Sequence, residues 1–202
     1  MVREMNADIR KTKERDFESI LAVINDAAGA YRGVIPADRW REPYMRRDEL
    51  RQEMACGVDF WAMFDGESLL GVMGMQDKND VSLVRHAYTI TTLQGQGIGA
   101  RLLHHVRSLS NKPMLIGTWA AASWAIGFYE KHGFKMVSPA EKNRLLGKYW
   151  SIPQRQVETS VVLADSAWMD TYGQEDAAQP VVGDGRQLRK PRPSRRHDQH
   201  RR

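Results

Sequence analysis

The chain has 202 residues, 42% of them hydrophobic, which is enough for one domain with a sizeable core and a terminal segment. No apolar run approaches the ~18 residues that a membrane-spanning helix needs, and the N-terminus lacks the apolar region of a secretory signal. We therefore expect a cytoplasmic protein with no membrane partner. Cys56 is the single cysteine, which excludes an internal disulfide and a cysteine-rich zinc site.

The net charge of +5 is unevenly distributed along the chain. Residues 186–202 contain eight Lys or Arg residues and one acid, Asp198, so this segment carries +7 and leaves −2 for residues 1–185. The near-neutral folded part lacks the basic patch that binds nucleic acid, so we expect it to bind no nucleic acid. We assign residues 166–202 to a basic C-terminal tail, which is either a solvated appendage or a segment that binds RNA or an acidic partner. From residue 173 onward we expect disorder, because little apolar area offsets an ordering cost of about 1–2 kcal/mol per residue.

Seven short runs have the alternating or continuous apolar pattern of β-strands. In chain order they are residues 8–11, 58–64, 68–76, 81–90, 113–118, 134–137 and 156–163. Asp65-Gly66 is a strong hairpin signal and Lys78-Asn79-Asp80 is a second polar turn, so we expect the second to fourth strands to form an antiparallel meander.

Four segments have apolar residues at helical spacing. They are residues 17–28, 50–54, 98–106 and 122–132. Thr12 is the expected N-cap of the first helix, and Gly57 is expected to end the second. The elements together predict an α/β fold of the α+β type, with a mixed sheet of about seven strands flanked by about four helices.

Three glycines, Gly95, Gly97 and Gly99, stand between the fourth strand and the third helix. A P-loop is excluded because no Lys-Ser/Thr pair follows. Gly95, Gly97 and Ala100 formally match a dinucleotide-binding fingerprint. That motif also needs an Asp or Glu at the end of the next strand, and the next strand here reads "PMLIGTWAA". The remaining interpretations are a tight turn without a ligand and a pyrophosphate cradle, Q-x-x-G-x-G, made of backbone N–H groups and a helix N-terminus.

Two motifs in this order resemble the GNAT family of N-acetyltransferases. The loop from Gln94 to Ala100, followed by "RLL", is similar to the family's pyrophosphate loop, and "AIGFYEKHGF", residues 125–134, is similar to its second signature. The resemblance covers about residues 7–164, so we place a GNAT domain at residues 1–165. Two positions depart from the pattern: Ala122 stands where the family often has Asn, beside Ser123, and Thr91 stands where it often has Pro.

The resemblance implies a mostly antiparallel sheet whose fourth and fifth strands splay apart to admit the pantetheine arm of acetyl-CoA, the co-substrate. It implies that no metal takes part. The cofactor-binding residues that it implies are the backbone of Tyr88, Thr89 and Ile90, the loop residues Gln94, Gly95, Gln96, Gly97, Ile98, Gly99 and Ala100, and Ser123 in place of the missing Asn.

The implied reaction is direct attack of a primary amine on the acetyl group, for which two residues are catalytic candidates. The amine must lose a proton, and either His86 or an ordered water can take it, because histidine titrates near ~6.5. The departing thiolate needs a proton, and Tyr129 matches the family's general acid. The alternative role of Tyr129 is to pack beside Phe128 and Phe134.

The resemblance places the acceptor amine between the first two helices and the segment before the last strand. The side chains there that we expect to bind it are Tyr31, Arg32, Trp40, Tyr44, Tyr149 and Trp150. Their aromatic character favours a small apolar or aromatic amine or a peptide end as partner. The alternative function is an acetyl-CoA-binding sensor or interaction module without efficient turnover, and a homodimer stays open.

Overall fold

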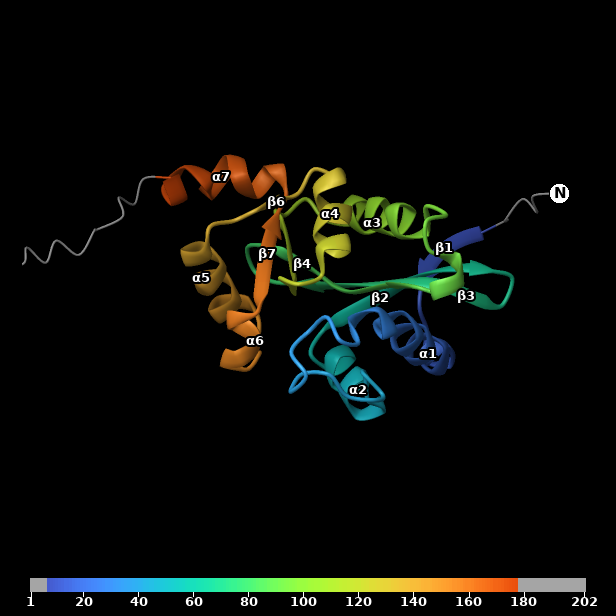
Figure 1. Ribbon diagram of the computed structural model, residues 1–202. Coiled ribbons are helices and arrows are strands. Elements are labelled where there is room, and N and C mark those ends of the chain that lie inside the picture. The colour runs from blue at the N-terminus through green and yellow to red at the C-terminus, as the bar shows by residue number, and fades with distance from the viewer. Residues whose placement is uncertain (1–6, 178–202) are drawn as a thin grey trace, which may run out of the picture.

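The computed structural model describes residues 7–177, and a seven-stranded mixed sheet forms its centre (Figure 1). The strands are β1 (Ala7–Lys11), β2 (Val58–Asp65), β3 (Ser68–Asp77), β4 (Ser82–Thr89), β5 (Met114–Trp119), β6 (Lys135–Met136) and β7 (Ser160–Ala164). Their order in the sheet is β1-β2-β3-β4-β5-β7-β6. The pair β4–β5 is parallel and the other pairs are antiparallel, which confirms the predicted mostly antiparallel sheet.

Helices cover both faces of this sheet. The α-helices are α1 (Phe17–Ala28), α2 (Arg47–Ala55), α3 (Ile98–Ser108), α4 (Ser123–Lys131), α5 (Pro139–Tyr149), α6 (Gln154–Glu158) and α7 (Ser166–Ala177). Figure 1 shows α1 and α2 on one face and α3 and α4 on the other. The buried side chains follow this division: Ile20 and Leu50 pack with β2 and β3 on one face, and Leu102 and Val106 of α3 pack with the opposite face.

Two sequence predictions about local structure were wrong. The first helix does not start from Thr12, whose hydroxyl bonds the carbonyl of Phe60 in β2. A 3₁₀ turn, Glu14–Asp16, intervenes, and the Asp16 carboxylate accepts the backbone N–H of Lys13. The predicted strand at 156–163 begins only at Ser160, because Pro153 starts the helix α6 instead.

The helix α5 was not predicted, although its start is visible in the sequence. The Ser138 hydroxyl accepts the backbone N–H of Glu141 at 3.2 Å, and Pro139 occupies the first helical position. A serine N-cap followed by proline and, at the third position, glutamate is a helix-start signature.

The ordered chain also continues beyond residue 165, where the tail was expected to begin. Asp165 starts α7 by accepting the backbone N–H of Trp168 at 3.0 Å. Trp168 is only 2% exposed and packs with Leu115 and Leu145, which offsets the cost of ordering the helix. The start of the expected tail is therefore part of the packed fold. Disorder was expected from residue 173 onward, which is wrong for residues 173–177, because they belong to α7. The rest of that expectation, residues 178–202, lies outside the described residues.

The strands β4 and β5 pair over a short distance and then separate. Their register joins Ser82 to Met114, Leu83 to Leu115 and Val84 to Ile116, and no further pairs follow. The predicted splay is therefore present, and it leaves the β5-facing edge of residues 85–89 without a strand partner.

A β-bulge lies in β4 just after the separation. Gly74 of β3 pairs with Arg85 and Val72 pairs with Tyr88, so one residue on β3 faces two on β4. His86, within the bulge, has a φ of 49°, which is uncommon for a residue other than glycine. In the described part of the chain no helix is long and apolar enough to cross a membrane.

The packing of α7 predicts that Trp168→Ala destabilises the domain. Large-to-small substitution of a buried tryptophan costs about 3–5 kcal/mol, which lowers Tm by on the order of 10 °C for a domain of this size. Thermal unfolding followed by circular dichroism measures the shift. Leu109→Ala, at a side chain that is 40% exposed, is the control and should change Tm little. Equal Tm values for both variants would contradict the packing role of α7.

Candidate active site

The glycine loop forms an open cradle at the start of α3. Gly97 is the N-cap of this helix with a φ of 81°, and Gly95 has a φ of 78°, conformations that favour glycine. A Cβ placed on either glycine would meet nothing within 4 Å, so there is free space above the loop. The first N–H groups of a helix have no partner inside it and carry the positive end of its dipole. The loop can therefore bind a doubly charged anion such as a pyrophosphate.

The entry to this loop is fixed by α1. The backbone N–H of Thr91 donates to the Asp26 carboxylate at 2.7 Å. Proline has no N–H, so the residue that the family often has at this position could not make this bond. The departure from the family pattern is thus compensated by an additional anchor between the loop and α1.

A cavity of about 430 Å³ extends from the loop along β4 towards α4. Of the predicted cofactor-binding residues, those that line it are Tyr88, Thr89, Gln94, Gly95, Gly97, Ile98, Gly99 and Ala100. The other three predicted residues, Ile90, Gln96 and Ser123, are sequence neighbours of lining residues but do not line the cavity. Its opposite wall is made by Trp124 and Phe128 of α4.

A second cavity, of about 160 Å³, lies between the separated strands, the 31–44 segment and the segment before β7. Its lining includes the aromatic residues Tyr31, Tyr44, Tyr88, Trp119, Tyr129 and Trp150 together with Arg85, His86, Gln156 and Ser160. Both cavities share part of their walls. The shared residues are Tyr31, Ala87, Tyr88, Ala125 and Tyr129. A thioester in the first cavity and an amine in the second would therefore meet at this wall.

Tyrosines dominate the junction of the two cavities. The ring of Tyr31 lies 5.5 Å from that of Tyr44 and 6.5 Å from that of Tyr88, between ring centroids. Burial raises the pKa of Tyr31 to about 12, and it also raises the pKa values of Tyr88 and Tyr129 above the usual value. These hydroxyls therefore stay protonated at neutral pH. Among the described residues the Tyr129 hydroxyl has no hydrogen-bond partner, so it is free to donate to a ligand.

His86 reaches the second cavity from the bulge of β4. Its Nε2 atom lies 3.2 Å from a carboxylate oxygen of Glu53 on α2, and its ring stacks on Phe60 at 5.8 Å between centroids. The Arg85 guanidinium also holds Glu53, through contacts of 2.9 and 2.7 Å to the two oxygens. Burial would raise the pKa of Glu53, but His86 and Arg85 stabilise the carboxylate more strongly and keep the pKa below its usual range.

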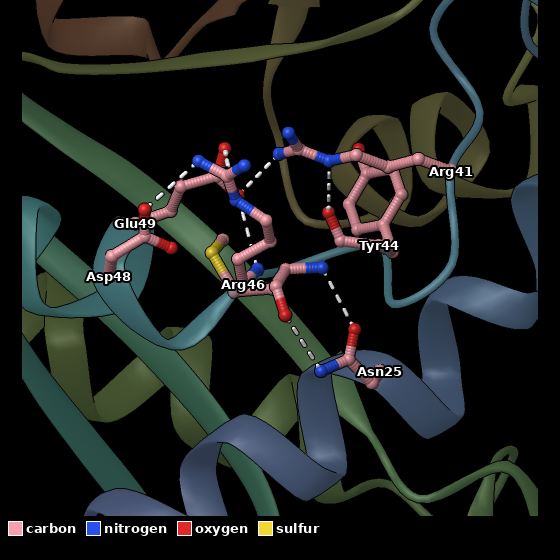
Figure 2. Close-up of polar contacts among 7 residues, drawn as sticks. Asn25, Arg41, Tyr44, Arg46, Asp48 and Glu49 are labelled. Atoms are coloured by element: carbon pink, nitrogen blue, oxygen red, sulfur yellow. Dashed lines mark hydrogen bonds and ion pairs between the residues drawn. The ribbon is translucent and has the colours of Figure 1, made fainter.

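The segment before α2 is held in place by hydrogen bonds from α1 and α2 (Figure 2). Asn25 of α1 clamps Met45, accepting its N–H at 2.8 Å and donating to its carbonyl oxygen at 3.0 Å. Arg41 donates to the carbonyl of Tyr44 at 3.1 Å and pairs with Glu49 of α2. These contacts fix Tyr44, whose hydroxyl accepts the indole N–H of Trp119 at 3.2 Å.

The predicted acceptor residues divide into two groups. Tyr31, Tyr44 and Trp150 line the second cavity. Three others lie outside its lining: Trp40 stacks on Tyr44 at 5.8 Å, Arg32 pairs with Glu42, and the Tyr149 hydroxyl donates to Asp80 at 2.6 Å. Tyr149 is therefore held away from the junction where a second proton donor would have to act.

Sequence reasoning missed several residues of the site. Trp124 follows the predicted Ser123 and lies 5.7 Å from Tyr31 between ring centroids, and its 47% exposure places it at the cavity mouth. Trp119 is the last residue of β5 and lines the second cavity. Glu53 is part of a polar helix and gave no signal, because its partner His86 is 33 positions further along the chain. Groups of three or more His, Cys, Asp or Glu side chains that could hold a metal are absent from the residues that the structure describes.

Comparison with known proteins agrees with this geometry. The sequence profile described as "Acetyltransferase (GNAT) domain" matches residues 24–146. This chain therefore belongs to the GNAT acetyltransferase family. A search of curated proteins returns no match.

Solved structures of the same fold include three with described activities. The PaiA N-acetyltransferase of Thermoplasma acidophilum, in complex with coenzyme A, is 18% identical with a TM-score of 0.60, over 80% of this chain and 99% of that one. The ribosomal-protein-S18-alanine N-acetyltransferase of Escherichia coli is 13% identical with a TM-score of 0.55, over 79% and 92%. N-acetylglutamate synthase of Neisseria gonorrhoeae, with coenzyme A and N-acetyl-glutamate, is 17% identical with a TM-score of 0.54, over 81% and 35%. At these identities the likeness shows the fold alone.

The cradle predicts that Gly97→Val abolishes coenzyme A binding without unfolding the protein. A β-branched residue strains the left-handed backbone and places methyl groups in the space above the loop. Isothermal titration calorimetry with coenzyme A measures the loss. Gly66→Val is the matched control, since Gly66 also has a positive φ, 61°, and open space around it, but lies in the β2–β3 turn. Unchanged affinity in the Gly97 variant would remove the assignment of the loop.

Proposed function

We propose that the protein transfers the acetyl group of acetyl-CoA to a primary amine of a small molecule or peptide by direct attack. The observation that carries the proposal is the wall shared by the two cavities, with Tyr129 between them. One cavity begins at an anion cradle and suits the pyrophosphate and pantetheine arm. The other has an imidazole and aromatic side chains, and it suits a small acceptor.

Positioning supplies much of the proposed rate enhancement. The unpaired edge of β4, residues 85–89, offers backbone groups to the amide-bearing pantetheine arm, as an added strand would. Holding amine and thioester together removes translational entropy from the barrier, worth up to about 7–11 kcal/mol in ideal cases.

The proposed reaction needs one group that accepts a proton and one that donates a proton. The amine loses a proton to His86, and its lone pair forms the C–N bond while the C–S bond breaks. The leaving thiolate takes the proton of Tyr129. Burial raises the pKa of Tyr129, and the same buried environment raises the pKa of a thiol, so the difference between donor and acceptor stays small.

The proposal predicts that Tyr129→Phe slows the chemical step. The ring and its packing remain while the hydroxyl is lost, so acetyl-CoA should bind nearly as before. General acid catalysis typically contributes ~10²–10⁴-fold, and we expect the single-turnover rate with a productive amine to fall by at least about tenfold. Rapid-quench measurement of acetylated product reads this rate without interference from product release.

The matched control for this variant is Tyr172→Phe, which removes the hydroxyl of a half-buried tyrosine on α7, remote from both cavities. It should keep the parental rate. A parental single-turnover rate in the Tyr129 variant itself would show that the thiolate leaves unprotonated or that another group protonates it.

A further inference from the structure

We propose that Glu53 is a positioning residue that holds the proton of His86 on Nε2, so that the lone pair on Nδ1 is directed to the acceptor amine. This proposal rests on the proposed function, in which His86 removes the amine proton. Glu53 itself lines neither cavity, so it acts through His86 and not on the substrate.

The contact between Glu53 and His86 determines which nitrogen is protonated. The carboxylate oxygen lies 3.2 Å from Nε2, and this is the one polar contact of that nitrogen among the described residues. An ionised carboxylate can only accept, so a neutral imidazole facing it carries its proton on Nε2. The contact is not a well-aligned hydrogen bond, as is common for catalytic contacts before a substrate binds.

The bulge in β4 makes this arrangement possible. Adjacent residues of a regular strand point to opposite faces of the sheet. Here Arg85 and His86 are adjacent, yet both contact the same carboxylate of Glu53 on α2. The extra residue of the bulge and the positive φ of His86 turn the imidazole towards α2. The strained backbone thus serves the contact with Glu53.

A chain of hydrogen bonds fixes the carboxylate. Gln76 of β3 donates to the carbonyl of Cys56 at the end of α2, at 2.8 Å, and accepts from Arg85 at 3.0 Å. Arg85 in turn holds both oxygens of Glu53. The side chain of Glu53 is only 27% exposed and that of His86 14%, so solvent screens the contact weakly.

In the described part of the chain, the charged groups around the imidazole of His86 are one carboxylate and one guanidinium. Glu53 from α2 and Arg85 from β4 are the charged groups that face it within the described residues, and their charges balance. Phe60 from β2 covers one face of the ring, while Tyr44 and Tyr88 share the cavity as protonated hydroxyls. When Nδ1 accepts the amine proton, the new positive charge forms beside the carboxylate, which stabilises it.

Nuclear magnetic resonance of histidine-labelled protein tests the tautomer directly. Long-range ¹H–¹⁵N spectra distinguish protonation at Nε2 from protonation at Nδ1, and the His86→Gln spectrum assigns the signal among the six histidines. We expect the Nε2–H form in the parental protein. In Glu53→Gln, Arg85 can only donate and should take the amide oxygen, which turns the amide NH₂ to His86 and moves the proton to Nδ1. A parental spectrum with the proton on Nδ1 would overturn the proposal.

Kinetics then test the consequence for acetyl transfer. Glu53→Gln should lower kcat on the order of 10²-fold, the typical contribution of a general base, with the coenzyme A Kd unchanged. Glu53→Asp should restore much of the rate, because it returns a carboxylate that can accept the Nε2 proton. Glu14→Gln is the control and should behave as the parent, because it removes an exposed ion pair to Arg51, which lies on α2 like Glu53.

The remaining outcomes separate this proposal from the function on which it rests. If Glu53→Gln does not fold, Glu53→Gln/Arg85→Gln leaves no charge unpaired, and it should show the same loss of kcat. Parental kcat in either variant, or an unchanged tautomer in Glu53→Gln, would overturn the role of Glu53. If no amine is acetylated by the parental protein, the proposed function fails, whereas the spectrum of the free protein still decides the tautomer.

Discussion

The separation of β4 from β5 after three residue pairs is the constraint on which the rest of the site depends. Sheet strands normally satisfy the backbone groups of their neighbours, and buried groups left unpaired are costly. Here β5 continues by pairing with β7, from Leu115 to Trp119, while β4 keeps only its pairing with β3. The gap between them is where the two cavities meet, so the same irregularity creates space for two reactants and exposes a backbone edge that can bind one of them.

The groups around this gap are mounted on rigid elements rather than on free loops. Tyr129 lies on α4 and is buried against the core, and His86 lies on a sheet strand whose bulge is locked to α2 through Glu53 and Arg85. Even the irregular segment before α2 is fixed, by Asn25 on one side and Glu49 on the other. Preorganised groups need little rearrangement during reaction, which is how a small site gains rate.

The sequence predicted those parts of the site that depend on local patterns. The roles of Gly95 and Gly97 can be recognised from the sequence, because only a left-handed backbone or a close approach requires glycine. Both glycines indeed have a positive φ. Sequence-based prediction failed where tertiary contacts determine the local structure. The alternating pattern of residues 156–163 suggested a strand, but Pro153 and the packing of α6 place residues 156–158 in a helix. The partnership of Glu53 with His86 depends on a bulge and on helix packing, and no spacing rule reveals it.

Fold and site together leave the acceptor as the decisive question, because GNAT proteins of similar fold have different acceptors and function resides in the site. The most direct test incubates the protein with acetyl-CoA and a panel of arylalkylamines, amino acids, polyamines and peptides, and measures free thiol and acetylated product by mass spectrometry. We expect at least one amine to yield an N-acetyl product in a one-to-one ratio with released thiol. Thiol release at the same slow rate with every amine, and without any acetylated product, would contradict the account and indicate a protein that binds acetyl-CoA without transferring its acetyl group.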